Sequence, residues 1–199
     1  MRHLSRIAVV AAMIAASVSC GDVVRDGKSP MFLGIDSLTP SPLLADVQKL
    51  VTTGVGCTTD NPCATITDDI ATVTLRTPLK NVTNPSSPNA PTTNNEVTLN
   101  RYHVTFTRTD GRNTPGVDVP FAFDGGISGT IPLGGTLTVS FEVVRHIAKA
   151  EAPLVQLVRS PSIIYTIAEV TFFGRDRVGN DISATGSMEV NFGNFSDTP

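Results

Sequence analysis

The three cysteines are the residues whose chemistry is easiest to state in this 199-residue sequence. Cys57 and Cys63 enclose a short polar segment, so a bond between their thiols would close a small loop. Such a bond persists when a protein is exported to an oxidising compartment. A zinc site is not favoured, because neither the spacing nor a nearby pair of histidines fits one. The spacing predicts a disulfide, and two unpaired thiols are the alternative.

The first 19 residues have the pattern of an export signal. Arg2 and Arg6 give a positive start, an apolar run follows at 7–16, and small residues precede Cys20. A membrane-spanning helix needs about 20 apolar residues, whereas a shorter run between a positive start and small residues is typical of a secretory signal peptide. We therefore expect residues 1–19 to be removed and Cys20 to begin the mature chain.

The residues before Cys20 resemble the lipobox of bacterial lipoproteins, in which the cysteine thiol receives a diacylglyceryl group. That family usually has Leu where this chain has Ser17, and Ser17 and Ser19 also suit ordinary signal peptidase. A secreted protein with a free N-terminal thiol is therefore the alternative. The unpaired third cysteine favours lipidation. The resemblance implies a lipid anchor in the cell envelope, and Gly21 after the cysteine implies the outer membrane in a Gram-negative cell.

No set of residues indicates catalysis. A hydrolase needs a nucleophile, a base and an orienting group in contact, but His3 leaves with the signal peptide, His103 falls within an expected strand and His146 falls in a charged crossover. The chain has no Gly-x-Ser-x-Gly elbow. Its glycine pairs do not precede a helix that could hold a phosphate. We therefore expect a non-enzyme without a cofactor.

Three aspartates are candidates for calcium binding. Asp124, Asp176 and Asp181 fall at expected loop edges, where carboxylates can join carbonyl oxygens around the ion. No segment matches an EF-hand, and aspartate is common in turns for backbone reasons alone. We therefore expect no metal, and a calcium-dependent C2-like or carbohydrate-binding module is an alternative.

Charged residues suggest a patch that could face a partner. Arg145, Lys149 and Glu151 lie close together in the sequence, and Arg112 lies in an earlier turn. A solvated surface is the alternative.

The formal net charge is −3. Removing residues 1–19 takes away Arg2 and Arg6, which leaves 13 Lys and Arg against 18 Asp and Glu, a net −5. Nucleic-acid binding needs clustered basic residues, which this chain lacks.

Apolar and polar residues alternate along much of the chain, which predicts strands with one buried face. In the last pair, Phe172, Val190 and Phe192 should lie in the core, while Asn191 should face outward. The segment 145–159 breaks the alternation and predicts a short helix or an irregular crossover, and a further short strand is expected near 46–51. The expected main strands, lettered A, B, C, C′, E, F and G, are 31–37, 70–77, 97–108, 117–123, 136–144, 163–174 and 181–195.

About seven strands separated by turn signals predict an all-β sandwich. The pattern over 31–195 resembles immunoglobulin-like and fibronectin type III-like domains, although the chain has no Trp and no cysteine pair that would span two sheets. Three segments (109–113, 117–120 and 168–176) are similar to uncharacterised bacterial lipoproteins with such a domain. The resemblance implies a non-catalytic module that binds a protein or glycan, or a structural accessory subunit of an envelope assembly.

The chain thus divides into a signal peptide (1–19), a lipid-anchored tether (20–30), the sandwich (31–195) and a tail (196–199). In a fibronectin-like domain, strand A begins at the end that carries the B–C and F–G loops. We therefore expect 78–96 and 175–180 to lie where the tether enters. The Cys57–Cys63 loop, the turn 110–113 and the crossover 145–151 should lie at the opposite end, where a partner would dock.

Overall fold

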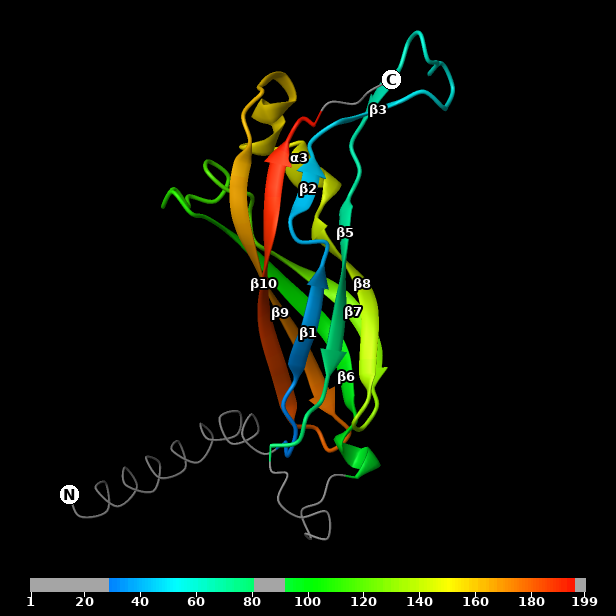
Figure 1. Cartoon of the computed structure of the whole chain (residues 1–199), viewed down its shortest axis with the longest axis vertical. Helices are drawn as coiled ribbons and strands as arrows, with labels where there is room; N and C mark the ends of the chain where they lie inside the picture. The colour runs from blue at the N-terminus through cyan, green and yellow to red at the C-terminus, as the bar shows by residue number, and fades with distance from the viewer. Residues whose placement is uncertain (1–28, 81–91, 196–199) are drawn as a thin grey trace, which may run out of the picture.

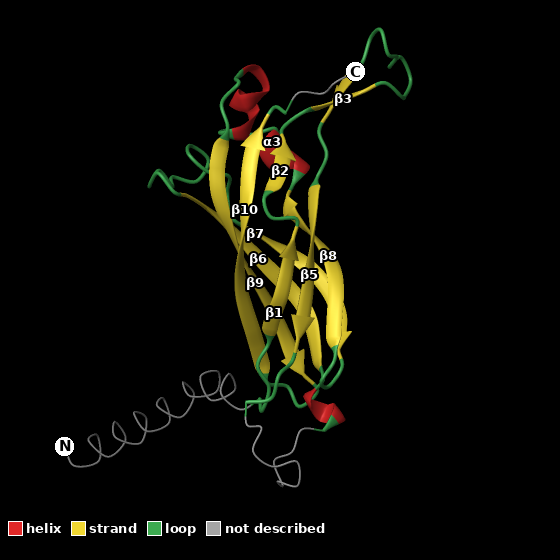
Figure 2. Ribbon diagram, viewed as in Figure 1, coloured by secondary structure: helices red, strands yellow, loops and turns green. Residues whose placement is uncertain are grey.

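The computed structural model describes residues 29–80 and 92–195, so the signal peptide, Cys20 and most of the expected 81–95 loop lie outside the described residues. Two β-sheets face each other as a sandwich, with short helical turns at the ends (Figures 1 and 2). The all-β class expected from the alternating sequence is confirmed.

A sheet of three strands faces one of five. The first has the order β1-β5-β8, the second has the order β2-β10-β9-β6-β7, and a separate ladder joins β3 to β4. The three-stranded sheet consists of β1 (Gly34–Thr39), β5 (Asp69–Arg76) and β8 (Thr136–Val144). The five-stranded sheet consists of β2 (Leu43–Asp46), β6 (Val97–Arg108), β7 (Phe123–Ile131), β9 (Ile164–Asp176) and β10 (Asp181–Gly193). The remaining elements are β3 (Lys49–Val51), β4 (Cys63–Thr65), η1 (Thr93–Asn95), α3 (His146–Lys149) and η2 (Leu154–Arg159).

Most expected strands coincide with observed ones. Strands C and E match β6 and β8, strands B, F and G match β5, β9 and β10 to within two residues, and strand A begins a few residues later, as β1. The short strand expected at 46–51 is divided between β2 and β3, and the expected crossover contains α3 and η2. Alternation located these strands well because one face of each is buried.

The prediction of a strand at 117–123 is wrong, because the strand that follows β6 is β7, in the Gly-rich segment that begins at Phe123. Glycine is depleted in strands, so this Gly-rich segment did not have the sequence pattern of a strand. Here it makes room for core side chains: a Cβ on Gly125 would lie 2.1 Å from the Tyr102 ring, and one on Gly129 would lie 2.7 Å from the Leu137 side chain. Hydrogen bonding to β6 places β7 in the five-stranded sheet.

The first strand of the domain changes sheets. β1 pairs antiparallel with β5, whereas β2 pairs parallel with β10, with Leu43 opposite Val190. Pro40 and Pro42 lie between β1 and β2. Proline has no backbone N–H to donate to a ladder, so this segment leaves one sheet before it joins the other.

The core lies between the sheets, and the prediction for its last strands is confirmed. Phe172, Val190 and Phe192 are fully buried. Phe192 packs edge-on against Phe106, with ring centroids 5.5 Å apart. Asn191, expected to face outward without cost, is also buried, and its Nδ2 donates to Glu189 Oε1 at 2.8 Å.

The loops divide between two ends as expected. At the entry end, which comprises residues 29–32, 78–80, 93–95 and 177–180, Lys80 N donates to Pro30 O at 2.8 Å and Arg177 N donates to Asn94 O at 3.0 Å. Ser29, two residues before the expected start of the sandwich, is buried there. The distal end carries the β3–β4 hairpin, α3 and η2 (Figure 1).

Candidate partner-binding site

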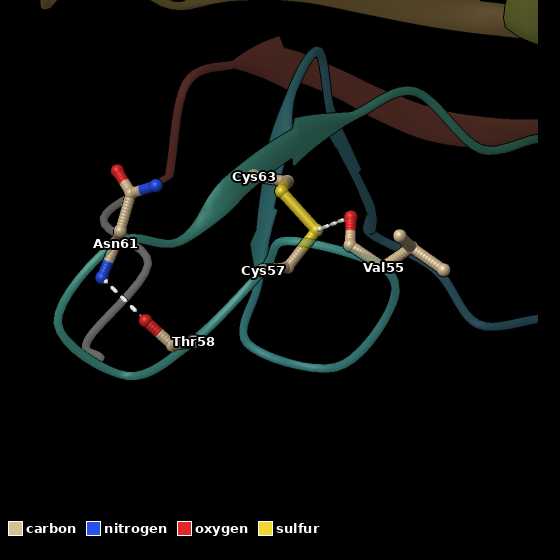
Figure 3. The surroundings of a disulfide bond; sticks show 5 residues. All are labelled: Val55, Cys57, Thr58, Asn61 and Cys63. Atoms are coloured by element: carbon tan, nitrogen blue, oxygen red, sulfur yellow. Dashed lines mark hydrogen bonds between the residues drawn. A yellow bond between two sulfur atoms is a disulfide. The ribbon is translucent and has the colours of Figure 1, made fainter.

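A disulfide-closed hairpin projects from the distal end. β3 and β4 pair antiparallel, with Val51 opposite Cys63. The predicted bond between Cys57 and Cys63 is confirmed, with a Cα–Cα distance of 5.2 Å (Figure 3). Inside the loop, Asn61 N donates to Thr58 Oγ1 at 3.0 Å, and Thr58 N donates to Asn61 O at 3.0 Å. Figure 1 shows the hairpin reaching beyond the sandwich, so the bridge stiffens a projection and does not join the sheets.

The loop after β6 is held by a chain of charges. The Asp110 carboxylate accepts hydrogen bonds from Arg108 Nε at 3.0 Å and from Arg112 Nε at 3.1 Å. The guanidinium groups of Arg108 and Arg112 hold the pKa of Asp110 well below its usual range. Arg112, expected to face a partner, is exposed but shares the Asp110 carboxylate within its own loop.

The next part of this loop presents an aromatic ring. Asp118 N donates to Thr114 O at 2.8 Å, and Thr114 N donates to Asp118 Oδ2 at 3.2 Å, which closes a compact turn. Gly116 has a φ of 74°, and the Phe121 ring lies where a Cβ on this glycine would be, 2.5 Å away. The Phe121 ring thus packs against the turn although the residue is 58% exposed.

Arg145 and His146 attach the crossover to its neighbours. The Arg145 guanidinium lies 4.1 Å from the centre of the Phe123 ring, and its Nη2 donates to the Asp124 carbonyl. His146 N donates to Asp68 Oδ1 at 2.5 Å, and His146 Nδ1 lies 2.8 Å from the same oxygen. The hydrogen bond from the His146 backbone is the main reason that the pKa of Asp68 is lowered.

A shallow groove separates the segment before β7 from the crossover. Its volume is about 190 Å³. Arg145 and Glu151 line one wall with Ile147, and Phe121 lies on the other. Of the four residues predicted to form a charged patch, the structure therefore brings two together at one groove. Arg112 lies apart, in the loop after β6.

Lys149 is a correction to the predicted patch, because its side chain is completely buried. Its Nζ lies 2.8 Å from Asp69 Oδ2 and donates to the Asp46 carbonyl at 2.7 Å. Lysine is almost never fully buried unless it is paired, and no sequence pattern indicated that Asp69, at the start of β5, would supply the partner. Lys149 is not available to a docking partner.

Exposed apolar side chains gather at the distal end, and sequence analysis missed them because they fall in loops or at strand ends. Ile147 in α3 is 57% exposed, close to the value for Phe121. Among residues 29–80 and 92–195, the large exposed apolar residues at the entry end are Phe32, Leu133 and Val178. In the distal half they are Leu44, Leu50, Val55, Ile66, Ile70, Val117, Phe121, Ile147, Val155, Ile163 and Tyr165.

The three calcium candidates do not converge. Asp124 pairs with Arg101 and lies opposite His103, whereas Asp176 lies opposite Val97, six residues away along β6. At about 3.3 Å per residue this separation is about 20 Å. Asp176 is buried and accepts from the backbone N–H groups of its own turn, and Asp181 pairs with Arg175.

Within residues 29–80 and 92–195, no three His, Cys, Asp or Glu side chains are grouped so that they could hold a metal ion. Across the same residues, no helix has the length and apolar character needed to cross a membrane. No protein-family model matches the chain, and a search of curated proteins found no match.

Proposed function

We propose that this protein is a non-catalytic lipoprotein of the bacterial cell envelope, anchored through Cys20, whose sandwich binds a protein partner with its distal end. One observation carries the proposal: the described chain enters the domain at one end, and most of its large exposed apolar side chains lie toward the other. Large exposed apolar groups mark interaction sites on soluble domains. Aromatic residues and arginine are enriched in protein interfaces.

The position of the anchor supports this orientation. Between Cys20 and the buried Ser29 the chain advances nine residues, which reach about 30 Å at most when fully extended. The entry end would therefore stay near the lipid. β9 has 13 residues and spans about 40 Å, so the distal end would face away from the membrane that holds the anchor.

The distal loops have the rigidity that a binding surface needs. The Cys57–Cys63 bridge closes one projection, and internal hydrogen bonds close the turn against which Phe121 packs. Arg145 is held over the Phe123 ring beside the groove. Loops positioned by a rigid scaffold are favoured sites of recognition, because little conformational entropy is lost when they bind.

Recovery of partners from solubilised envelope tests the proposal. The double variant Phe121→Ser and Ile147→Ser removes two exposed apolar side chains beside the groove. Val178→Ser is the matched control, since Val178 is similarly exposed (65%) but lies at the entry end. We expect the double variant to fold and to lose the partner that the control retains. Equal recovery by both variants would contradict a distal site and would favour an accessory role in which the domain is only a scaffold.

The same preparation separates the calcium-dependent alternative. Asp124 and Asp181 are engaged by arginines, and Asp176 by the backbone of its turn. We therefore expect partner recovery to be unchanged by calcium or by a chelator. Loss of the partner on chelation would favour a calcium-dependent module instead.

A further inference from the structure

The buried amine of Lys149 lies against a carboxyl group inside the distal half of the sandwich. Lys149 Nζ is 2.8 Å from Asp69 Oδ2, and the two side chains are 0% and 8% exposed. A third element fixes the amine, since Nζ also donates to the Asp46 carbonyl at 2.7 Å. The contact thus joins α3, β5 and β2, which are far apart in the sequence.

Burial favours the neutral form of the Asp69 carboxyl group. Removing an ammonium and a carboxylate from water is costly even when they are paired, and burial raises the pKa of Asp69 despite the attraction of Lys149. Transfer of one proton from the ammonium to the carboxylate leaves a neutral amine beside a neutral carboxylic acid. The amine then has a lone pair, and water is excluded from the pair.

We propose that Lys149 and Asp69 condense to an intramolecular amide bond. The lone pair of Lys149 Nζ attacks Asp69 Cγ, so a C–N bond forms and one carbon–oxygen bond of the carboxyl group breaks. The departing oxygen leaves as water with two hydrogens from the original ammonium, and the third stays on the amide nitrogen. No oxidant, reductant or further reactant is needed.

Two features of the site promote this reaction. Fixed contact between two groups replaces a bimolecular encounter and can greatly raise their effective concentration. The Asp46 carbonyl accepts a hydrogen bond from the amine and so holds it within 2.8 Å of Asp69 Oδ2, which has no hydrogen-bond partner of its own. The bond would tie the crossover to the three-stranded sheet close to the groove. Unlike the Cys57–Cys63 bridge, it would survive reduction.

Peptide mapping of the exported full-length protein tests the proposal. After denaturation, reduction and alkylation, trypsin releases residues 50–76, which contain Asp69, because Lys49 and Arg76 flank them. It cuts after Arg145, Lys149 and Arg159 when those side chains are free. We expect no cut at Lys149 and a branched species of 50–76 joined to 146–159, one water lighter than the two peptides together.

Fragmentation should place the branch at Asp69 and not at the neighbouring Asp68. Asp69→Ala should restore cleavage after Lys149, whereas the matched control Asp68→Ala, which removes the exposed carboxylate beside His146, should keep the branch. Quantitative release of 146–149 and 150–159 from wild-type protein would overturn the proposal. So would a branch at any acid other than Asp69.

Discussion

Replacing Phe192 by Ala tests the packing of the two sheets most severely. The Phe192 side chain is fully buried near the distal end of β10 and packs edge-on against Phe106 at a centroid distance of 5.5 Å. Its surroundings leave little freedom for the site to collapse, because Val190 on the same strand is fully buried and Ile164, opposite it on β9, is also buried.

The expected loss is large relative to the stability of the domain. Truncating a buried Phe to Ala costs about 3–5 kcal/mol, and whole domains have only about 5–15 kcal/mol. For a domain of this size, each kcal/mol lowers Tm by about 2–4 °C. Phe192→Ala should therefore lower Tm by roughly 6–20 °C. Thermal and urea unfolding of purified protein would measure the change.

The control must come from the exposed face of the same strand. Asn191 is unsuitable, because it is buried and hydrogen-bonded to Glu189. Ser187 is exposed on β10, so Ser187→Ala should change the free energy of unfolding by no more than about 0.5 kcal/mol. Similar losses for Phe192→Ala and Ser187→Ala would show that the register of β10 given above is wrong.

Four other perturbations have expected outcomes. Cys20→Ala should release the protein from membranes or block its maturation, and unchanged membrane fractionation would contradict lipid anchoring. Replacing Cys57 and Cys63 by Ser should cost no more than about 2–3 kcal/mol, seen by urea unfolding, and should expose the hairpin to proteases; a larger loss would mean that the bridge holds the sandwich. Asp176→Ala removes hydrogen bonds from Val178 N at 3.1 Å and Asn180 N at 2.8 Å, so it should cost about 1.5–3 kcal/mol, with or without calcium. The pKa of Asp68 is lowered on folding, so its stabilisation is present above the unfolded pKa of 3.8 and is lost as the pH falls through the folded pKa; an NMR titration midpoint above 3.8 would refute this.

The strands could be predicted because burial of one face leaves a period of two in the sequence. Leu137, Val139, Phe141 and Val143 alternate with polar residues, and β8 has the expected bounds. The same signal failed for β7, where Gly125 makes room for the Tyr102 ring. Glycine has no side chain, so a strand in which glycines face the core has no alternating apolar pattern from which it could be predicted.

The candidate site was only partly predictable. The disulfide and the two ends of the domain followed from spacing and strand order, whereas the role of Lys149 did not. Its partners Asp69 and Asp46 come from β5 and β2, which only tertiary packing brings to α3. The exposure of Phe121 and Ile147 likewise depends on how the loop and crossover lie against the sandwich.

Photo-crosslinking in intact cells tests most directly whether the distal end meets a partner. A photoreactive amino acid would replace Ile147 or Phe121 at the distal end, or Val178 or Leu133 at the entry end, each of them exposed. We expect the two distal positions to capture the same protein and the two entry-end positions to capture none of it. Capture of that protein from the entry end alone, or equally from both ends, would contradict the proposed function.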